Sequence, residues 1–314
     1  MIDFRYHVVS IVAVFLALAL GLFIGSTSLR GPVANFINSR TDQVVGQNRQ
    51  LRSEISSLQA SVRDEQQFET ATQPYITGNV LAGESVVVVS APGTDGGTRT
   101  RLISALTAAG ANVTGDVRLQ DALLDPNQRT FLETLVARLG VPGHDVPPGT
   151  GAQRAMSLLA QVLGIRPQST PVPPTATARV LAGFTDGNLV TVNGSVARSA
   201  SLAVVLAPPP PSANADPKTV QSQDDLLLDL VRALDHSAVG AVLAGPLASA
   251  DTGLLKAARA DKLLTANVST VDGVDLPRGI IATVLALAQQ AKGGVGSYGT
   301  QSGASGPVPS PSPS

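Results

Sequence analysis

The sequence has no cysteine and no tryptophan, and the missing cysteine excludes several kinds of chemistry. The chain can form no disulfide, no thiolate metal site and no cysteine nucleophile. Charged residues make up only 14% of the chain and the net charge is -1, so no basic excess attracts nucleic acid. We therefore expect no nucleic-acid partner. The lack of cysteine is compatible with either side of a membrane.

Metal-binding side chains are also scarce. The candidates are His7, His144, His236, Met1 and Met156. They are far apart in the sequence and lack the clustered spacing of copper or zinc sites. His236 suits a helix C-terminus and His144 a solvated Gly/Pro loop. We predict no metal ligands and no resident cofactor.

Catalytic and nucleotide-binding motifs are missing as well. Neither a G-x-G-x-x-G nor a G-x-x-x-x-G-K-[ST] loop is present, and there is no G-x-S-x-G nucleophile elbow. One weak candidate for anion binding is the strand-to-helix loop that contains Gly93, Gly96, Gly97 and Thr98. The alternative, which we favour, is a plain turn capped by Thr98. The sequence predicts that the protein is not an enzyme.

A long hydrophobic run is what the sequence does have. Residues 8–25 read VVSIVAVFLALALGLFIG and carry no charge. About 18 helical residues cross most of a hydrocarbon core of roughly 30 Å. We predict a transmembrane anchor over residues 1–30, with the N-terminus cytoplasmic and the rest extracytoplasmic. The alternative is a cleaved signal peptide, which the length of the run disfavours.

Small residues recur along this helix at every fourth position, at Ala13, Ala17, Gly21 and Gly25. Such a strip lets a second helix approach closely, which favours a dimer. The alternative is that small residues are simply common in membrane helices.

A heptad pattern follows over residues 31–73. The d positions are Ile37, Val44, Leu51 and Leu58, and the a positions include Asn48, Ile55 and Val62. β-Branched a residues with leucine at d, and one asparagine at a, are typical of a parallel two-stranded coiled coil. We predict a homodimeric stalk, or a higher homo-oligomer. The alternative is a single amphipathic helix that packs on the head.

The rest of the chain alternates strand-like and helix-like segments, which indicates an α/β head over residues 78–292 with an open parallel sheet of the Rossmann or flavodoxin type. We predict strands at 85–90, 200–207 and 239–244. We predict helices at 98–109, 127–139, 152–163, 224–234 and 277–292, and loops at 166–175 and 208–217. Residues 293–314 are Gly, Ser and Pro with little apolar bulk, so we predict a disordered tail.

Two end motifs give the chain a family resemblance. The block R-x-H-x-V-S-x-x-A-V-F-L-A-L-A-x-G-x-x-x-G from Arg5 to Gly25, and Tyr298-Gly299 after the last helix, resemble the actinobacterial copper transporter family of MctB type. The resemblance covers the chain to about Thr300. It implies a protein of the cell envelope, in the plasma or outer membrane, that acts in copper efflux or homeostasis as a channel or transport component. No copper ligand can be carried over.

The resemblance leaves a second function open. Some members of the family look like membrane partners of a cell-division protein. The alternative function is therefore a dimeric envelope scaffold that presents its head to a cell-division or cell-wall partner.

Overall fold

The computed structural model of the chain describes residues 4–28, 30–167, 169–194 and 199–310, without the side chains of residues 27–39, 41 and 42. The side chain of Ile37, a predicted seam residue, lies outside this described part. Internal contacts divide the chain into two compact units, Met1–Glu65 and Gln66–Ser314. Each unit is described by itself.

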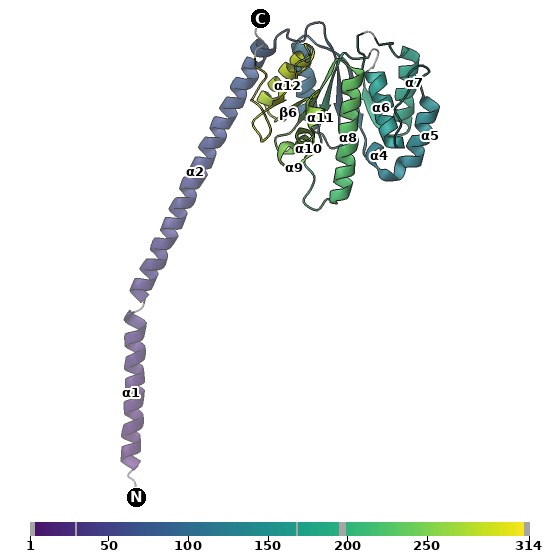
Figure 1. Cartoon of the computed structure of the whole chain (residues 1–314). Helices are drawn as coiled ribbons and strands as arrows, with labels where there is room; N and C mark the ends of the chain where they lie inside the picture. The colour runs from purple at the N-terminus through teal and green to yellow at the C-terminus, as the bar shows by residue number, and fades with distance from the viewer. Residues whose placement is uncertain (1–3, 29, 168, 195–198, 311–314) are drawn as a thin grey trace. The chain divides into compact units, whose positions relative to one another are not determined.

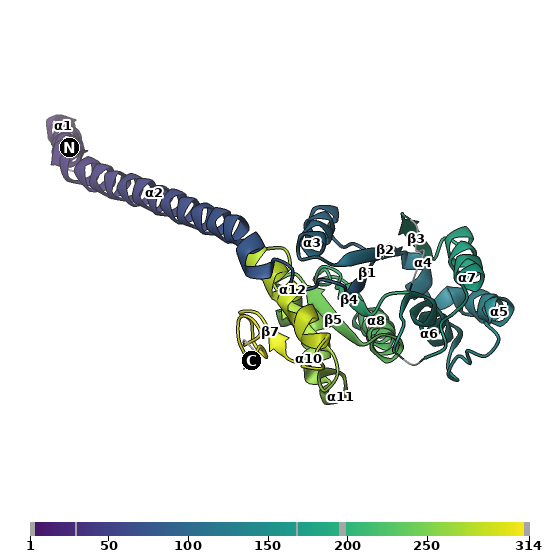
Figure 2. The same ribbon diagram turned by 90° about the horizontal axis from the view of Figure 1, so that it is seen from above.

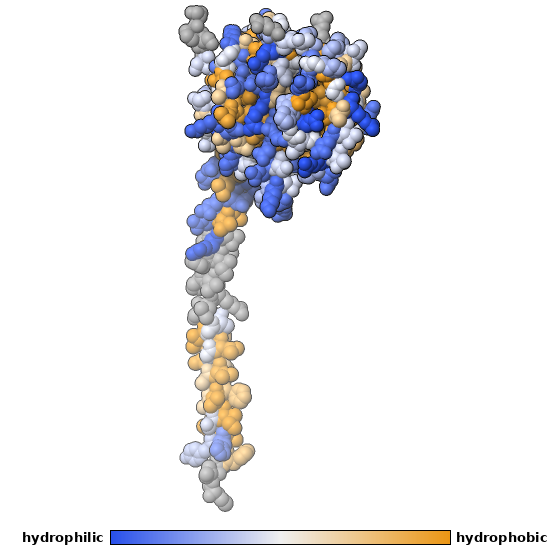
Figure 3. All heavy atoms as spheres, turned by 45° about the vertical axis from the view of Figure 1, so that its right-hand side comes forward, coloured by the Kyte–Doolittle hydropathy of each residue, from blue (hydrophilic) through white to orange (hydrophobic). Residues whose placement is uncertain are grey.

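Helix α1 (Phe4–Ser28) is the predicted anchor. Within the described residues, Phe4–Ser26 is the one stretch of 23 residues that is long and apolar enough to cross a membrane. At 1.5 Å per residue it spans about 34 Å, slightly more than a hydrocarbon core of about 30 Å. None of the span is buried, and most of the surface that Figure 3 shows along it is hydrophobic.

Helix α2 (Arg30–Thr77) continues for 48 residues and contains the predicted heptads. Its seam residues are exposed over 50 to 65% of their surface, namely Val44, Leu51, Ile55, Leu58 and Val62. Gln50 Nε2 donates to Glu54 Oε1 at 2.9 Å, one turn further on the same helix. The helix is confirmed, whereas the coiled coil needs a second chain and stays a prediction.

The head contains a seven-stranded sheet in the order β3-β2-β1-β4-β5-β6-β7. The strands are β1 (Ser85–Ser90), β2 (Asn112–Leu119), β3 (Val190–Asn193), β4 (Leu202–Leu206), β5 (Gly240–Gly245), β6 (Ser269–Asp272) and β7 (Ser297–Tyr298). All neighbours are parallel except β2 and β3. The predicted α/β class with a largely parallel sheet is confirmed.

Helices cover both faces of the sheet (Figures 1 and 2). One face holds α3 (Gly96–Ala108) and α12 (Pro277–Gln290), which pack on Val86 and Val88 of β1. The other face packs on Val87 and Val89. It holds α4 (Asp121–Leu124), α5 (Arg129–Leu139), α6 (Gly151–Leu163), α7 (Pro174–Asp186), α8 (Pro217–Ser237), α9 (Ser249–Thr252), α10 (Leu254–Ala260) and α11 (Lys262–Thr265), with the 3-10 turn η1 (Pro126–Gln128) between α4 and α5. Because β1 is buried from both sides, it forms a continuous apolar run.

Most of the predicted elements of the head are present, with shifted ends. The three predicted strands are β1, β4 and β5, and the five predicted helices are α3, α5, α6, α8 and α12. Helix α8 begins at Pro217, seven residues before the predicted start, because the Asp216 carboxylate accepts the N–H of Thr219 at 3.0 Å and caps the helix. Helix α7 begins inside the predicted loop 166–175, with Pro174 at its first turn.

The prediction of a disordered tail from Gly293 is wrong for residues 293–310. Ser297 and Tyr298 form β7, which pairs with β6, and Tyr298 is only 6% exposed. The backbone N–H of Gly299 also donates to the carbonyl of Gly306 at 2.9 Å. Composition did not reveal this segment because polar contacts with the sheet, described below, hold it in place. Residues 311–314 lie outside the described part.

The last turns of α2 contact the head through Glu69. Its Oε2 accepts the backbone N–H of Arg278 at 3.2 Å, and its Oε1 lies 3.8 Å from the Arg278 guanidinium. Arg278 is in the first turn of α12, whose N-cap residue Leu276 provides no side-chain cap. Glu69 therefore supplies an acidic partner at a helix N-terminus, where negative charge is favourable.

Candidate functional site: polar cavities along helix α8

Helix α8 has two unlike sides. Its apolar residues Leu227, Leu228, Leu230, Val231 and Leu234 are buried in the core. On another side, polar residues follow one another at steps of three or four, which places them along one stripe of the helix. They are Ser222, Asp225, Asp229, Arg232 and His236. This polar stripe lines a series of cavities.

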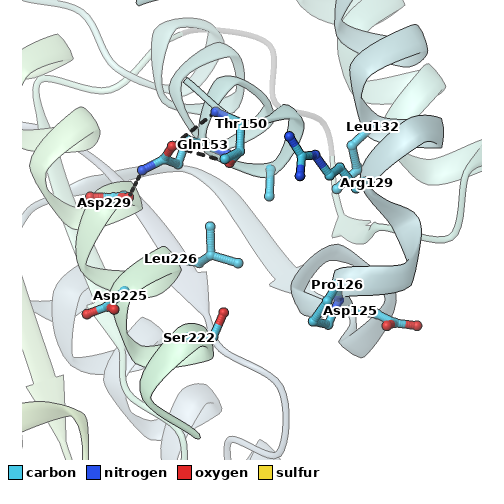
Figure 4. Close-up of a pocket in the computed structure, with 11 residues that line it drawn as sticks. Asp125, Pro126, Arg129, Leu132, Thr150, Gln153, Ser222, Asp225, Leu226 and Asp229 are labelled. Carbon is cyan, nitrogen blue, oxygen red and sulfur yellow. Dashed lines mark hydrogen bonds between the residues drawn. The ribbon is translucent and has the colours of Figure 1, made fainter. Parts of the chain in front are cut away.

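The largest of these cavities has a volume of about 400 Å³ and lies between α8, the start of α5 and the start of α6 (Figure 4). Leu132, Leu226, Ala152 and Pro126 give it an apolar part. Its polar lining consists of Asp125, Arg129, Thr150, Gln153, Ser222, Asp225 and Asp229. A cavity with an apolar part and a few convergent polar groups is the usual form of a ligand site.

Gln153 connects two walls of this cavity (Figure 4). It belongs to a capping box at the start of α6, in which Thr150 N–H donates to Gln153 Oε1 at 3.0 Å and Gln153 N–H donates to Thr150 Oγ1 at 3.3 Å. Gln153 Nε2 then donates to Asp229 Oδ2 of α8 at 2.9 Å. One side chain therefore caps α6 and fixes its start against α8.

The acidic side chains of the cavity differ in their ion pairs and hydrogen bonds. Asp229 also accepts from Arg232 at 2.7 Å, and Arg232 forms a second ion pair with Asp261. Burial raises the pKa of Asp224, the residue before Asp225, to about 6, and the charge of Asp225 adds to this shift. Three carboxylates line the cavity, those of Asp125, Asp225 and Asp229, against one cation, Arg129, and this balance favours a cation or a donor-rich ligand.

Two further cavities continue along α8 toward its C-terminus. A cavity of about 320 Å³ shares Gln153 and Asp229 with the first, and a cavity of about 270 Å³ shares Gln161, His236 and Ser237 with the second. We call these three cavities the α8 groove. Among the described residues, no group of three or more His, Cys, Asp or Glu side chains gathers to hold a metal ion.

The predicted anion loop contains an acidic side chain of the chain itself. Asp95 Oδ2 accepts the N–H of Thr98 at 2.6 Å, and this backbone hydrogen bond lowers the pKa of Asp95. Asp95, rather than Thr98, caps α3. Gly93 has a positive φ of 76° and lies against Pro209. Any anion at Gly96, Gly97 and Thr98 has to displace the Asp95 carboxylate, which supports the interpretation as a plain turn.

The predicted dimer residues of the anchor lie on α1. Ala13, Ala17, Gly21 and Gly25 are exposed, and a methyl group added at Gly21 or Gly25 would meet no atom within 4 Å. The strip is therefore accessible to a second helix, and the dimer stays a prediction. His7 is also on α1, whereas His144 and His236 both line the cavity of about 270 Å³ in the head.

A buried ion pair that the sequence did not predict holds the C-terminal segment. Arg259 of α10 and Asp272 at the end of β6 are 2.9 Å apart, with side chains 5% and 1% exposed. Asp272 accepts the N–H groups of Thr300 at 2.9 Å and Gln301 at 3.3 Å, while Arg259 donates to the carbonyl of Tyr298 at 2.8 Å. We call this arrangement the Arg259–Asp272 clamp.

The position after Tyr298 requires glycine, which is Gly299. Its φ is 129°, and a Cβ at this position would fall on the carboxylate of Asp272. Only glycine allows the backbone to pass this close to the clamp. The one feature of the sequence that points to the clamp is an aspartate, Asp272, at the end of a short strand-like segment. Its partner Arg259 could not be identified without the fold.

These features define a class: a protein with one apolar N-terminal helix suited to a membrane, a long helical stalk, and an α/β head with polar cavities along one helix. Comparison with known proteins then identifies the family. The family model described as "Copper transport outer membrane protein, MctB" matches residues 1–309, so the chain belongs to the MctB family.

Curated relatives agree with this assignment. A Mycobacterium tuberculosis protein named "Copper transporter MctB" is 28% identical over 318 residues, which cover 97% of this chain and 98% of the relative. The protein of the same name from Mycobacterium leprae is 29% identical over 319 residues, with the same coverage. The similarity therefore includes the anchor, the stalk and the head.

Proposed function

We propose that this protein is an envelope protein of copper homeostasis that takes part in moving copper out of the cell. The observation that carries the proposal is the family match, which runs from residue 1 to residue 309. The relatives whose sequences align with 97% of this chain are named copper transporters. In the proposed arrangement α1 crosses a membrane, and the head lies on the extracytoplasmic side.

A single helix encloses no pore, so conduction would require several α1 helices packed together. Ala13, Ala17, Gly21 and Gly25 favour such packing because small side chains let helix backbones approach closely. Copper is the transported ion in this proposal, not a resident cofactor.

The test is a strain that lacks the protein, compared with the same strain carrying the wild-type chain. We expect more copper per cell and growth inhibition at lower copper concentrations in the deletion strain, with both effects reversed by the wild-type chain. Cellular zinc serves as the control and should not change. Unchanged copper content and copper tolerance in the deletion strain would contradict the proposal.

A second candidate function is a dimeric scaffold that presents the head to a cell-division or cell-wall partner. The exposed seam of α2 favours it, because five apolar side chains at heptad positions are at least half exposed in the single chain. A parallel partner helix would cover them, and Asn48 would fix the register.

Substitutions in the seam test this second candidate. Asn48→Leu removes the polar a position, so we expect tighter association and a mixture of oligomeric states in membrane cross-linking. Gln47→Leu, a neighbouring change outside the a and d positions, is the matched control and should leave the cross-linked species unchanged. Monomer alone in every sample would exclude the dimer. Purification from membranes without a reproducible partner would count against the scaffold.

A further inference from the structure

Polar atoms without a hydrogen-bond partner gather on the first two strands of the sheet. Within the described part of the chain, five buried side-chain polar atoms have no partner, and four of them belong to β1 and β2, namely Ser90 Oγ, Thr114 Oγ1, Asp116 Oδ1 and Arg118 Nε. Ser90, Thr114 and Asp116 are 2%, 7% and 9% exposed. Because folded proteins pair nearly all of their buried polar groups, such a concentration indicates that a molecule outside the chain completes the cluster.

Three of these side chains share one face of the sheet. Ser90 lies opposite Arg118 in the parallel register of β1 and β2. Val88 lies opposite Asp116 and packs on the side of α3 and α12. Because residues two apart in a strand point the same way, Ser90, Asp116 and Arg118 also point to that side. Helix α3 lies next to both strands there (Figure 2). The three side chains are near the carboxyl ends of the strands, the edge at which open α/β sheets bind their ligands.

The amide of Asn193, on the neighbouring strand β3, shows which groups this cluster accepts. Its Nδ2 donates to Asp116 Oδ2 at 2.9 Å, and its Oδ1 accepts from Arg118 Nη2 at 3.4 Å. A donor and an acceptor side by side thus match the carboxylate and the guanidinium. Asp116 Oδ1 and Arg118 Nε, a second acceptor and a second donor of the same two groups, have no partner within the described residues. A ligand for them needs one atom that donates to Asp116 and one that accepts from Arg118.

The charges of the cluster favour an anion over a neutral ligand. Arg99 of α3 forms an ion pair with Asp116 through Oδ2, so the charge of this carboxylate is already balanced. Arg118 forms no ion pair with any described residue. Two guanidinium groups against one carboxylate leave one positive charge, that of Arg118. The hydroxyl of Ser90, opposite Arg118, supplies a further donor for the same anion.

We propose that the cluster binds a phosphate group that retains a proton, from inorganic phosphate or a phosphate monoester. One phosphate oxygen accepts from Arg118 Nε and Ser90 Oγ, and the P–OH group donates to Asp116 Oδ1. Arginine is well suited to phosphate oxygens. Sulfate has no proton at neutral pH, so it would leave Asp116 Oδ1 without a donor and place like charges side by side.

Entry of the ligand requires movement of Arg118. Its hydrogen bond of 3.4 Å with Asn193 is longer than a good hydrogen bond, and the side chain of Asn193 is exposed. We infer that the ligand enters past Asn193 and takes the place of this contact. The site does not depend on the role in copper homeostasis.

The experiment is a calorimetric titration of the full-length chain in detergent micelles with inorganic phosphate, glycerol 3-phosphate and sulfate. At about pH 6, near the second pKa of a phosphate monoester, both phosphates carry a proton. We expect one phosphate per chain and sulfate binding that is weaker by about tenfold or more. The phosphate that binds more tightly identifies the source, free phosphate or a monoester.

Two substitutions test the residues. Arg118→Gln should weaken phosphate binding by about tenfold or more, because it removes a hydrogen bond from a charged group. Ser90→Ala should weaken it by about fivefold, the effect of one neutral hydrogen bond, without lowering the melting temperature of the ligand-free chain. Arg138→Gln, which changes an exposed arginine of α5, is the matched control and should leave the affinity unchanged.

Three results would overturn the assignment. The first is a wild-type chain that binds neither phosphate, which would mean that water alone completes the cluster. The second is sulfate binding as tight as phosphate binding, which would remove the role of Asp116 Oδ1. Both are measured on the wild-type chain, so neither depends on whether the variants fold. The third is an unchanged phosphate affinity in both Arg118→Gln and Ser90→Ala.

Discussion

Replacement of Asp272 by asparagine tests the Arg259–Asp272 clamp. The substitution keeps the size of the side chain but removes its charge, so the guanidinium of Arg259, only 5% exposed, loses its ionic partner. Breaking one side of a buried ion pair costs about 3 to 5 kcal/mol, because the remaining charge stays buried and uncompensated. The N–H groups of Thr300 and Gln301 also lose a charged acceptor.

The expected loss is therefore about 4 kcal/mol in the free energy of unfolding, or roughly 8 to 16 °C in melting temperature for a domain of this size. Urea unfolding of the full-length chain in detergent, followed by tyrosine fluorescence, measures the loss. Hydrogen exchange locates it: residues 297–306 should lose protection before the central strands do.

Glu133→Gln provides the matched control. It removes the acidic partner of Arg129 in an ion pair at 3.2 Å whose side chains are 70% and 46% exposed. Surface pairs of this kind contribute from nearly zero to about 1 kcal/mol. If Asp272→Asn is no more destabilising than Glu133→Gln, or if residues 297–306 keep their protection, the clamp does not hold the C-terminal segment and the reasoning is refuted.

Three further predictions concern the head. Asp224→Asn should raise the free energy of unfolding at pH 7 by about 1 kcal/mol after allowance for solvent screening. The pKa of Asp224 is raised from 3.8 to about 6, so its carboxyl group contributes stability below about pH 4 that is lost as the pH rises through 6. Urea midpoints of the wild-type chain, measured from pH 4 to 8, should therefore show a decrease that is missing in the variant. Equal pH profiles for both chains would contradict this. Glu69→Gln should weaken the contact with Arg278 by about 0.5 to 1 kcal/mol, seen as faster hydrogen exchange in residues 66–77. Gly299→Ala should destabilise the head by about 3 kcal/mol or more, because its Cβ overlaps Asp272; an unchanged melting temperature would refute the close approach.

Sequence reasoning succeeded where one physical signal dominates a segment. The uncharged run of α1 is long enough to be read directly, and the continuously apolar β1, with its buried residues Val86 to Val89, indicated a strand covered on both faces. Helix α12 was found because Pro277 marks its first turn. Each of these elements depends on its own residues more than on distant partners.

It failed where distant residues decide the structure. Strand β2 contains Asp116 and Arg118, which weaken the pattern of a strand, yet Asp116 is paired with Arg99 of α3 and accepts from Asn193 of β3 at 2.9 Å. The short β7 depends on the clamp in the same manner. None of these partners is adjacent in sequence, so local pattern and composition cannot reveal them.

The candidate site was the hardest part to predict. His144 and His236 were recognised as individual residues but assigned to unrelated surroundings. Only the packing of α6 against α8 brings them to one cavity, together with Gln161. The polar stripe of α8 becomes visible only once the helix is known to run from Pro217 to Ser237, and the cavities beside it depend on where the α5 and α6 helices begin.

The Arg259–Asp272 clamp also bears on how this protein should be shortened for experiments. Composition alone suggests cutting the chain at Gly293, where the Gly, Ser and Pro residues begin. Such a cut would delete β7 together with Thr300 and Gln301, open the edge of β6 to pairing with other molecules, and leave a carboxylate without its backbone donors. A soluble head prepared for crystallisation or binding studies should retain the chain through residue 310.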